Sequence, residues 1–281
     1  MSEKETSFAY SSSEVAQYYG MTIKGMEYYE NRGLVHPERL GSGKIRRYSL
    51  LDSYRLFFAR MFKNLGIGLP ETLDILENNQ LSHLEKSFQK QIITMRSSLA
   101  IQQRMLEGLE HIRDLMAVME TGEVPMKITE EDGFYRLFLR HFNGPHISSD
   151  ANTAEYRNWN DYLPITNASL RIPLADCLEN RPLVDTQVGM IIKARDFHAL
   201  GLKESERTEQ IPAGRYLYTI ISADWKDLCS RDWICPALDY MESHGLRQTG
   251  DAFTRMIFVL KDENGSEIRY DEAWFPIDDR H

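Results

Sequence analysis

Hydrophobic and polar positions near the start of the chain follow the pattern of two short helices. Ser11 precedes an apolar-periodic run that ends at Gly20, and Thr22 precedes a second run, Ile23–Asn31, that ends at Gly33. Serine and threonine hydroxyls accept hydrogen bonds from the first backbone N–H groups of a helix, and glycine ends a helix because it readily adopts a left-handed conformation. The spacing predicts a helix-turn-helix unit.

A basic segment and two further helices are predicted next. Leu40–Tyr48 contains two glycines and then interleaves basic with apolar residues, which favours a hairpin. Ser49 opens a third helix that ends at Gly66. One face of this helix is expected to carry Leu56, Phe57, Met61 and Leu65. A fourth helix is predicted over Glu71–Glu77.

A long helix without proline is predicted from His83 to Glu120. Two heptad positions along it are occupied by Glu85, Ile92, Leu99, Leu106 and Arg113, and by Phe88, Met95, Gln102, Leu109 and Met116. Most of these residues are apolar, so the spacing predicts a coiled-coil helix that pairs with a second copy. The alternative is a long core helix within one globular domain.

After Thr121–Ile128, which we interpret as a linker, the pattern changes to short alternating segments. Two successive groups each follow the order strand, helix, strand, strand: Phe134–Phe142, Ala151–Leu163, Ser169–Leu174 and Thr186–Ala194, then Arg215–Ser222, Asp224–His244, Phe253–Leu260 and Glu267–Ile277. The repetition predicts an α+β domain with a ligand cleft between equivalent halves.

Composition and charge leave a nucleic-acid partner open. The 281 residues are 42% hydrophobic and 27% charged, as in ordinary globular proteins. The net charge is −9, but residues 1–70 carry +3 and the remainder carries −12. A locally basic region can bind DNA despite an acidic total, because the local field decides the encounter.

No apolar run is long enough to cross a membrane and no secretory signal is evident, so we expect a cytoplasmic protein. The three cysteines, Cys177, Cys229 and Cys235, favour a reducing compartment and are interpreted as packing residues. We expect no metal site and no cofactor.

Two parts of the chain resemble known families. The segments SSSEVAQYYGMTIKGMEYYENRGLVHPERL and IRRYSLLDSYRLFFARMFKNLGIGLPETLDIL, within Tyr10–Leu76, resemble the MerR family of transcription regulators. The later segments IPAGRYLYTII and EAWFPI, together with the repeated pattern, are similar to a GyrI-like effector-binding domain of the multidrug-sensing type.

The resemblance implies a multidomain α and α+β architecture. Residues 1–80 would form a winged helix-turn-helix DNA-binding domain, 81–121 a coiled-coil dimerisation helix, and 122–281 the GyrI-like effector domain with duplicated strand-helix-strand-strand halves. It also implies a homodimer that binds and distorts double-stranded promoter DNA, acts on RNA polymerase indirectly through that DNA, and senses a small organic molecule.

DNA contacts are expected from the second helix, the Leu40–Tyr48 hairpin (the wing) and the third helix: Thr22, Lys24, Glu27, Tyr28, Lys44, Arg46, Arg47, Tyr48 and Lys63. Glu27 departs from the resembled family, which has an arginine at this position. Its carboxylate could repel phosphate, accept from a cytosine amino group, or pair with Lys24 or Arg32.

The aromatic-rich tail offers candidate effector-binding residues: Glu272, Trp274, Tyr216, Tyr218, Tyr156, Trp159, Phe253 and Tyr270. In the resembled domain an acidic residue of the last strand faces the cleft, and Glu272 stands at that position. We expect a carboxylate buried there to serve an aromatic ligand that is cationic or donates a hydrogen bond. The alternative is that Glu272 is paired internally, for example by Arg215 or Tyr270.

The sequence therefore favours a ligand-responsive transcription regulator that is not an enzyme. One alternative is a GyrI-like hydrolase of small reactive compounds tethered to a DNA-binding head, although no nucleophile–base pair is evident. Another is a DNA-sequestering protein whose tail binds no small molecule. Turnover of such compounds would identify the first alternative, and transcription independent of ligand the second.

Overall fold

The computed structural model describes residues 10–41, 45–78, 81–121, 124–141, 150–179, 182–183 and 185–279. The chain divides into two compact units, residues 1–99 and 100–281, and helix α5 (Leu81–Glu120) contributes to both. The domain boundaries expected after residues 80 and 121 remain predictions. Along the described residues, no helix has the length and apolar character needed to cross a lipid bilayer.

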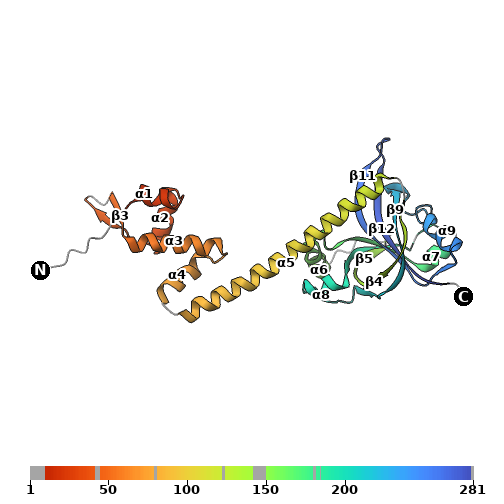
Figure 1. Cartoon of the computed structure of the whole chain (residues 1–281), viewed down its shortest axis with the longest axis horizontal. Helices are drawn as coiled ribbons and strands as arrows, with labels where there is room; N and C mark the ends of the chain where they lie inside the picture. The colour runs from red at the N-terminus through yellow and green to blue at the C-terminus, as the bar shows by residue number, and fades with distance from the viewer. Residues whose placement is uncertain are drawn as a thin grey trace. The chain divides into compact units, whose positions relative to one another are not determined.

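Short helices and a small antiparallel sheet build the first unit (Figure 1). The helices are α1 (Ser12–Tyr18), α2 (Ile23–Asn31), α3 (Leu50–Asn64) and α4 (Leu69–Asn78). The strands pair in the order β1-β3-β2, with β1 at Tyr10–Ser11, β2 at Glu38–Leu40 and β3 at Ile45–Tyr48. The predicted helix-turn-helix pair and the β2–β3 hairpin are confirmed.

Side-chain caps fix where the helices of this unit begin. Ser11 Oγ accepts from the backbone N–H of Glu14 at 3.3 Å, and the Glu14 carboxylate accepts from the N–H of Ser11 at 2.7 Å. Ser49 and Asp52 form the same reciprocal pair at the start of α3, and Thr22 Oγ1 accepts from Gly25 N–H at the start of α2. Since each cap is worth about 1 kcal/mol, these starts are encoded locally.

The core of the first unit lies between α1, α2 and α3. Its fully buried members include Val15, Met26, Leu34, Tyr48 and Leu56. On α3, Leu56, Ala59 and Phe62 face inward at helical spacing, whereas Phe57 is 49% exposed. The prediction that Phe57 shares one face with Leu56 is therefore wrong, because Phe57 lies about 100° around the helix from Leu56.

An antiparallel sheet with strand order β4-β9-β12-β11-β6-β7-β5-β8 forms the second unit, and β10 pairs with β12. The strands are β4 (Met126–Glu131), β5 (Phe134–His141), β6 (Asn167–Ile172), β7 (Gln187–Lys193), β8 (Thr208–Ile211), β9 (Gly214–Asp224), β10 (Leu246–Gln248), β11 (Ala252–Lys261) and β12 (Glu267–Asp279). The helices are α6 (Asp150–Asn160), α7 (Leu174–Leu178), α8 (Ala194–Ala199), the 3-10 turn η1 (Trp225–Asp227) and α9 (Cys235–Ser243).

The predicted repetition is present as β5-α6-β6-β7 and β9-α9-β11-β12. The two groups meet where Phe253 of β11 pairs with Arg171 of β6. Two details of the prediction are wrong. The helix expected over Asp224–His244 is broken into η1 and α9, and Pro236, which lacks a backbone N–H, lies in the first turn of α9. Part of the expected linker, from Met126 onward, belongs to β4.

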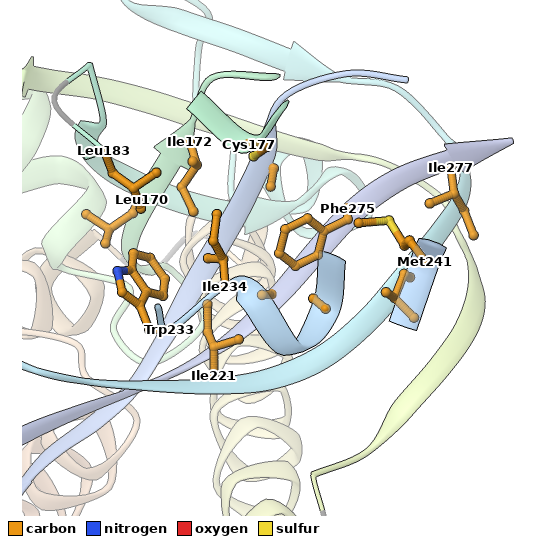
Figure 2. Packing of buried hydrophobic residues seen from close by; sticks show 14 of the residues in the cluster. Leu170, Ile172, Cys177, Leu183, Ile221, Trp233, Ile234, Met241, Phe275 and Ile277 are labelled. Carbon is orange, nitrogen blue, oxygen red and sulfur yellow. The ribbon is translucent and has the colours of Figure 1, made fainter. Parts of the chain in front are cut away.

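Helices α7 and α9 cover part of the sheet over an apolar cluster. Helices α7 and α9 lie near each other in Figure 1 and share the cluster drawn in Figure 2. In it Phe275 and Ile277 of β12 pack with Met241 of α9 and Cys177 of α7. Burial of one such large apolar side chain contributes about 1.5–3 kcal/mol. The predictions that Cys177 and Trp233 pack in the core are confirmed.

Helix α5 presents two different faces. One face packs on the second unit, where Ile101 and Met105 join the cluster of α6 and α8, Arg104 Nε lies 2.7 Å from Asp196 Oδ1, and Leu115 is buried. The heptad stripe lies on another face and is exposed at six positions: Ile92, Met95, Leu99, Leu106, Leu109 and Met116. An apolar stripe left open along one helix requires a partner to be covered.

Candidate DNA-binding surface and effector cavity

A cavity of about 340 Å³ lies within the second unit beside helix α5. Side chains of α5, the linker, β4, β7, β9, β11 and β12 line it: His111, Asp114, Leu115, Val118, Pro125, Lys127, Thr129, Glu131, Lys193, Tyr218, Arg255, Glu272 and Trp274. We call it the Glu272 cavity. Its size and mixture of aromatic and polar groups are typical of sites for small organic molecules.

Glu272 is the polar centre of this cavity and is almost fully buried. Its Oε1 accepts hydrogen bonds from Tyr218 Oη at 2.9 Å and from His111 Nε2 at 2.8 Å. Its Oε2 is bound by Arg255, whose Nε and Nη2 lie at 2.6 and 2.5 Å. Internal pairing of Glu272, the alternative to a ligand partner, is thus observed through Arg255, His111 and Tyr218, and the role of Glu272 toward a ligand stays a prediction.

The electrostatics of this network follow from the same contacts. Burial opposes ionisation of Glu272, but the charge of Arg255 and the hydrogen bond from His111 outweigh it, so the pKa of this carboxyl is lowered to about 2. Burial and the neighbouring Glu272 charge raise the pKa of the Tyr218 hydroxyl. At neutral pH the carboxylate is therefore ionised and accepts from a neutral phenol and from the imidazole.

The aromatic wall of the cavity is held by a second acidic group. Trp274 Nε1 donates to Glu131 Oε1 at 3.1 Å, and Lys193 Nζ lies 3.8 Å from Glu131 Oε2. The Trp274 ring is 5.6 Å from that of Tyr218. These contacts fix the orientation of two rings on which a flat molecule could stack.

Thr129 provides a polar group that the described residues leave unused. Its Oγ1 is buried in the cavity lining and has no hydrogen-bond partner among the residues that the structure describes. A buried hydroxyl without a partner costs about 1–3 kcal/mol, so a ligand or water that bonds to it gains that amount.

The predicted effector residues are only partly brought together. Glu272, Trp274 and Tyr218 line the Glu272 cavity. Tyr216 and Phe253 line a neighbouring cavity of about 420 Å³, walled also by Arg171 and Glu209. Elsewhere, Trp159 of α6 is buried in a core cluster, Tyr156 is 37% exposed, and Tyr270 packs against Phe258. The effector role of each residue stays a prediction.

The sequence interpretation missed Arg255 and His111. Arg255 lies directly across from Glu272 in the β11–β12 pairing and two residues after Phe253, so strand alternation identifies it only once the register of the two strands is known. His111 comes from helix α5, 161 residues before Glu272. Nothing in the local pattern around His111 indicates that contact.

In the first unit, Arg46 of the β2–β3 hairpin forms ion pairs with helix α2. Its Nη1 lies 3.0 Å from Glu27 Oε1 and its Nε lies 3.0 Å from Glu30 Oε2. Arg39 also pairs with Glu30. Of the alternatives for Glu27, internal pairing is observed, with Arg46 and not with Lys24 or Arg32. The Glu27 side chain remains 42% exposed.

The other predicted DNA-binding residues differ in accessibility. Lys24, Tyr28 and Lys63 are exposed, and Thr22 is exposed beside its capping bond. Arg47 is half-buried. Tyr48 is fully buried in the core, so the predicted DNA contact of Tyr48 is wrong for this conformation. Lys44 lies outside the described residues.

Metal ligands do not gather in the described part of the chain, where no group of three or more histidine, cysteine, aspartate or glutamate side chains could hold an ion. Cys229 and Cys235 are free and half-buried.

Comparison with known proteins identifies a family for the first unit. Residues 10–79 match the family described as "MerR HTH family regulatory protein". The HTH-type transcriptional activator TipA of Streptomyces coelicolor is 26% identical over 129 residues, which cover 45% of this chain and 47% of TipA. The chain thus spans about half the length of that relative.

A second relative is matched over more of its length. The uncharacterized HTH-type transcriptional regulator slr0701 of Synechocystis is 33% identical over 109 residues, which cover 37% of this chain and 79% of slr0701. Among solved structures, the EcmrR–DNA complex is 14% identical, covering 97% of this chain and 100% of that one, with a TM-score of 0.34.

Proposed function

The chain belongs to the MerR family of helix-turn-helix regulatory proteins, and from this premise we propose that it is a ligand-responsive transcription regulator. In this proposal a homodimer binds and distorts double-stranded promoter DNA, and a small organic molecule in the Glu272 cavity changes the DNA shape that is held. RNA polymerase responds through the DNA. A ligand can shift this equilibrium only if it binds one shape more tightly than the other.

Support for DNA binding comes from the first unit. Its paired helices α1 and α2 and its hairpin are the elements that insert into a major groove and contact the adjacent backbone. Lys24 and Lys63 carry exposed charges for phosphate contacts. Arg46 has a structural part in addition, because it holds the hairpin to α2 through Glu27 and Glu30.

Support for a homodimer comes from helix α5. Leu99 and Leu106 are 66% and 49% exposed, although they belong to the apolar heptad stripe. A second copy of the same helix presents the same stripe, so a symmetric pairing covers both.

The observation that carries the effector proposal is the bond between Glu272 and His111. It connects the wall of a ligand-sized cavity to helix α5, the helix that also carries the apolar stripe. A molecule that stacks on Trp274 and bonds to Thr129 would lie against this network. The free energy of ligand binding would then depend on the position of α5. Such a dependence is the requirement for allosteric coupling.

We also propose that the chain is not an enzyme. The relatives are named as transcription regulators. In the Glu272 cavity, both oxygens of the carboxylate are occupied by protein donors, so this group is poorly placed to act as a free general base.

The test combines binding with transcription. Duplexes selected from a random pool by the full chain would supply a binding site, and two-ring aromatic compounds would be screened by thermal stability. A ligand at one hundred times its Kd stabilises the protein by about 2.7 kcal/mol. The best ligand is expected to change transcription in vitro from a template carrying the selected site.

Two substitutions separate the cavity from nonspecific effects. Trp274→Ala is expected to abolish ligand binding and the transcriptional response while leaving DNA binding intact. Trp225→Ala provides the control, because Trp225 is 49% exposed and lies outside the cavity lining. Ligand binding without any change in transcription would contradict the regulatory proposal. Failure of every compound to bind, with DNA binding intact, would favour sequestration, and hydrolysis of the compounds would favour the enzyme.

A further inference from the structure

Arg255 occupies the place that a cationic ligand would take in the Glu272 cavity. Its guanidinium is bound to Glu272 Oε2 through Nε at 2.6 Å and Nη2 at 2.5 Å. The same guanidinium lies over the Trp274 ring, 5.9 Å from the ring centroid. An aromatic face and a buried carboxylate are the two features that attract an organic cation, and here both already contact a cation of the protein.

The remaining acceptor positions of Glu272 are also in use. Oε1 accepts from Tyr218 and from His111, so neither oxygen is left for a ligand ammonium group. An incoming cation would have to displace Arg255 or lie beside it. Two like charges at such short range repel each other, so a cation beside Arg255 is disfavoured.

The other charged groups of the lining favour the same conclusion. Each acidic side chain there has a basic neighbour: Glu131 is 3.8 Å from Lys193, Asp114 is 2.8 Å from Arg113, and Glu272 is bound by Arg255. Lys127, by contrast, forms no ion pair within the part of the chain that the structure describes, and it is exposed at the cavity. The unpaired charge available to a ligand is therefore positive.

We propose that Arg255 sets the charge specificity of the Glu272 cavity, so that it takes a flat aromatic molecule bearing a carboxylate or similar anionic group and excludes organic cations. This inference rests on the proposed function, because it assigns a ligand class to the same cavity. The rings of Trp274 and Tyr218 bind the aromatic part. Arg255 and the lysines at the cavity receive the anionic group.

Three probes with one ring system test the charge preference: 2-naphthoate, 2-naphthalenemethanol and 2-naphthylmethylammonium. Their Kd values are measured by calorimetry on the full chain at neutral pH and fixed ionic strength. Wild-type protein is expected to bind the carboxylate at least tenfold more tightly than the ammonium, with the alcohol between them. Arg255→Met, which keeps much of the side-chain volume, is expected to reverse that order, because Glu272 is then left without its main counter-ion.

Two variants complete the design. Arg247→Met is the matched control, because Arg247 is 67% exposed on β10 and lies outside the cavity, so the wild-type order should persist. The double variant Arg255→Met with Glu272→Gln removes both charges and should bring the carboxylate and ammonium probes within about threefold of each other. If circular dichroism shows that Arg255→Met does not fold, the order of the three Kd values in the wild-type protein and in the double variant still tests the inference.

The outcomes separate the inference from the proposed function. Equal or tighter binding of the ammonium probe by wild-type protein would overturn the role of Arg255 while leaving a ligand-binding cavity. The role of Arg255 would also be overturned if the Kd values of the probes in Arg255→Met had the same order as in the wild type. Failure of all three probes to bind would remove the cavity as an aromatic site, and the effector proposal would fall together with the inference.

Discussion

His111 Nε2 lies 2.8 Å from Glu272 Oε1, so the buried carboxylate of the cavity is bonded directly to helix α5. Because the carboxylate is ionised, it can only accept, and the imidazole is the donor in this bond. Helix α5 also carries the exposed apolar stripe. A change in the hydrogen bonds of Glu272 therefore directly alters a contact of helix α5, the helix that we propose for dimerisation. No intermediate residues are needed to connect the cavity to this helix.

The lowered pKa of Glu272 predicts an acid-dependent contribution to stability. The folded-state pKa of about 2 is below the ordinary value of 4.5, so the contribution is present above about pH 4.5 and is lost as the pH falls toward 2. Between pH 5 and pH 3 the loss from this one group is about 2 kcal/mol. Glu272→Gln should flatten the pH dependence of the free energy of unfolding by that amount, as measured by urea denaturation.

Glu263→Gln is the control for this measurement, because Glu263 is exposed in the turn between β11 and β12. It should retain the pH dependence of the wild type. If Glu272→Gln retained it as well, the network around Glu272 would not stabilise the ionised carboxylate.

Dimerisation is predicted to depend on the exposed stripe of α5. Leu99→Glu with Leu106→Glu should give a monomer by light scattering and abolish specific DNA binding, because buried like charges oppose pairing of the two helices. The monomer should remain folded, since both leucines are exposed in the single chain. Thr94→Glu with Ser97→Glu adds the same charge at exposed positions away from the stripe and should stay dimeric. A dimeric leucine double variant would refute the coiled-coil assignment.

DNA affinity is predicted to depend on exposed lysines of the first unit. Lys24→Ala and Lys63→Ala should each weaken binding to any duplex and reduce the slope of log K against log salt by about one, because each removes one phosphate contact. Fluorescence anisotropy over a salt series measures both effects. Lys226→Ala, an exposed lysine of the second unit, should change neither. A wild-type slope in both head variants would exclude these contacts.

Glu27→Gln is predicted to raise affinity for unrelated duplexes several-fold. The substitution removes a negative charge that is 42% exposed on α2 and frees Arg46 from one of its two ion pairs. Glu77→Gln, an equal change of charge on α4, should have little effect. A loss of affinity confined to the selected binding site would instead mean that Glu27 accepts from a base.

Two glycines are predicted to respond in opposite directions to alanine. A Cβ at Gly189 would lie 2.4 Å from the Leu137 carbonyl oxygen and 2.8 Å from Arg136 Nη2. Gly189→Ala should therefore destabilise the protein by about 2 kcal/mol. A Cβ at Gly108, inside α5, would make an ordinary 3.6 Å contact with Pro164. Gly108→Ala should stabilise by about 0.5–1 kcal/mol through helix propensity, and urea denaturation of both variants checks the contrast.

The sequence determined the local elements of the first unit because short-range forces specify them. The hydroxyls of Ser11, Thr22 and Ser49 bond to backbone groups three residues away, which is why the starts of α1, α2 and α3 could be predicted. The heptad spacing likewise predicted helix α5. Where the local signal was mixed, as over Asp224–His244, the predicted helix was too long.

The position of Glu272 could also be predicted, since strand alternation puts it on the same face as Trp274. The side chains that bond to the Glu272 carboxylate could not be predicted. Arg255, Tyr218 and His111 lie 17, 54 and 161 residues away in the chain. The register of β12 against β9 and β11 sets the first two contacts, and the packing of α5 sets the third. Side-chain periodicity carries no information on such long-range pairings, so only the tertiary structure decided that a protein cation already occupies this carboxylate.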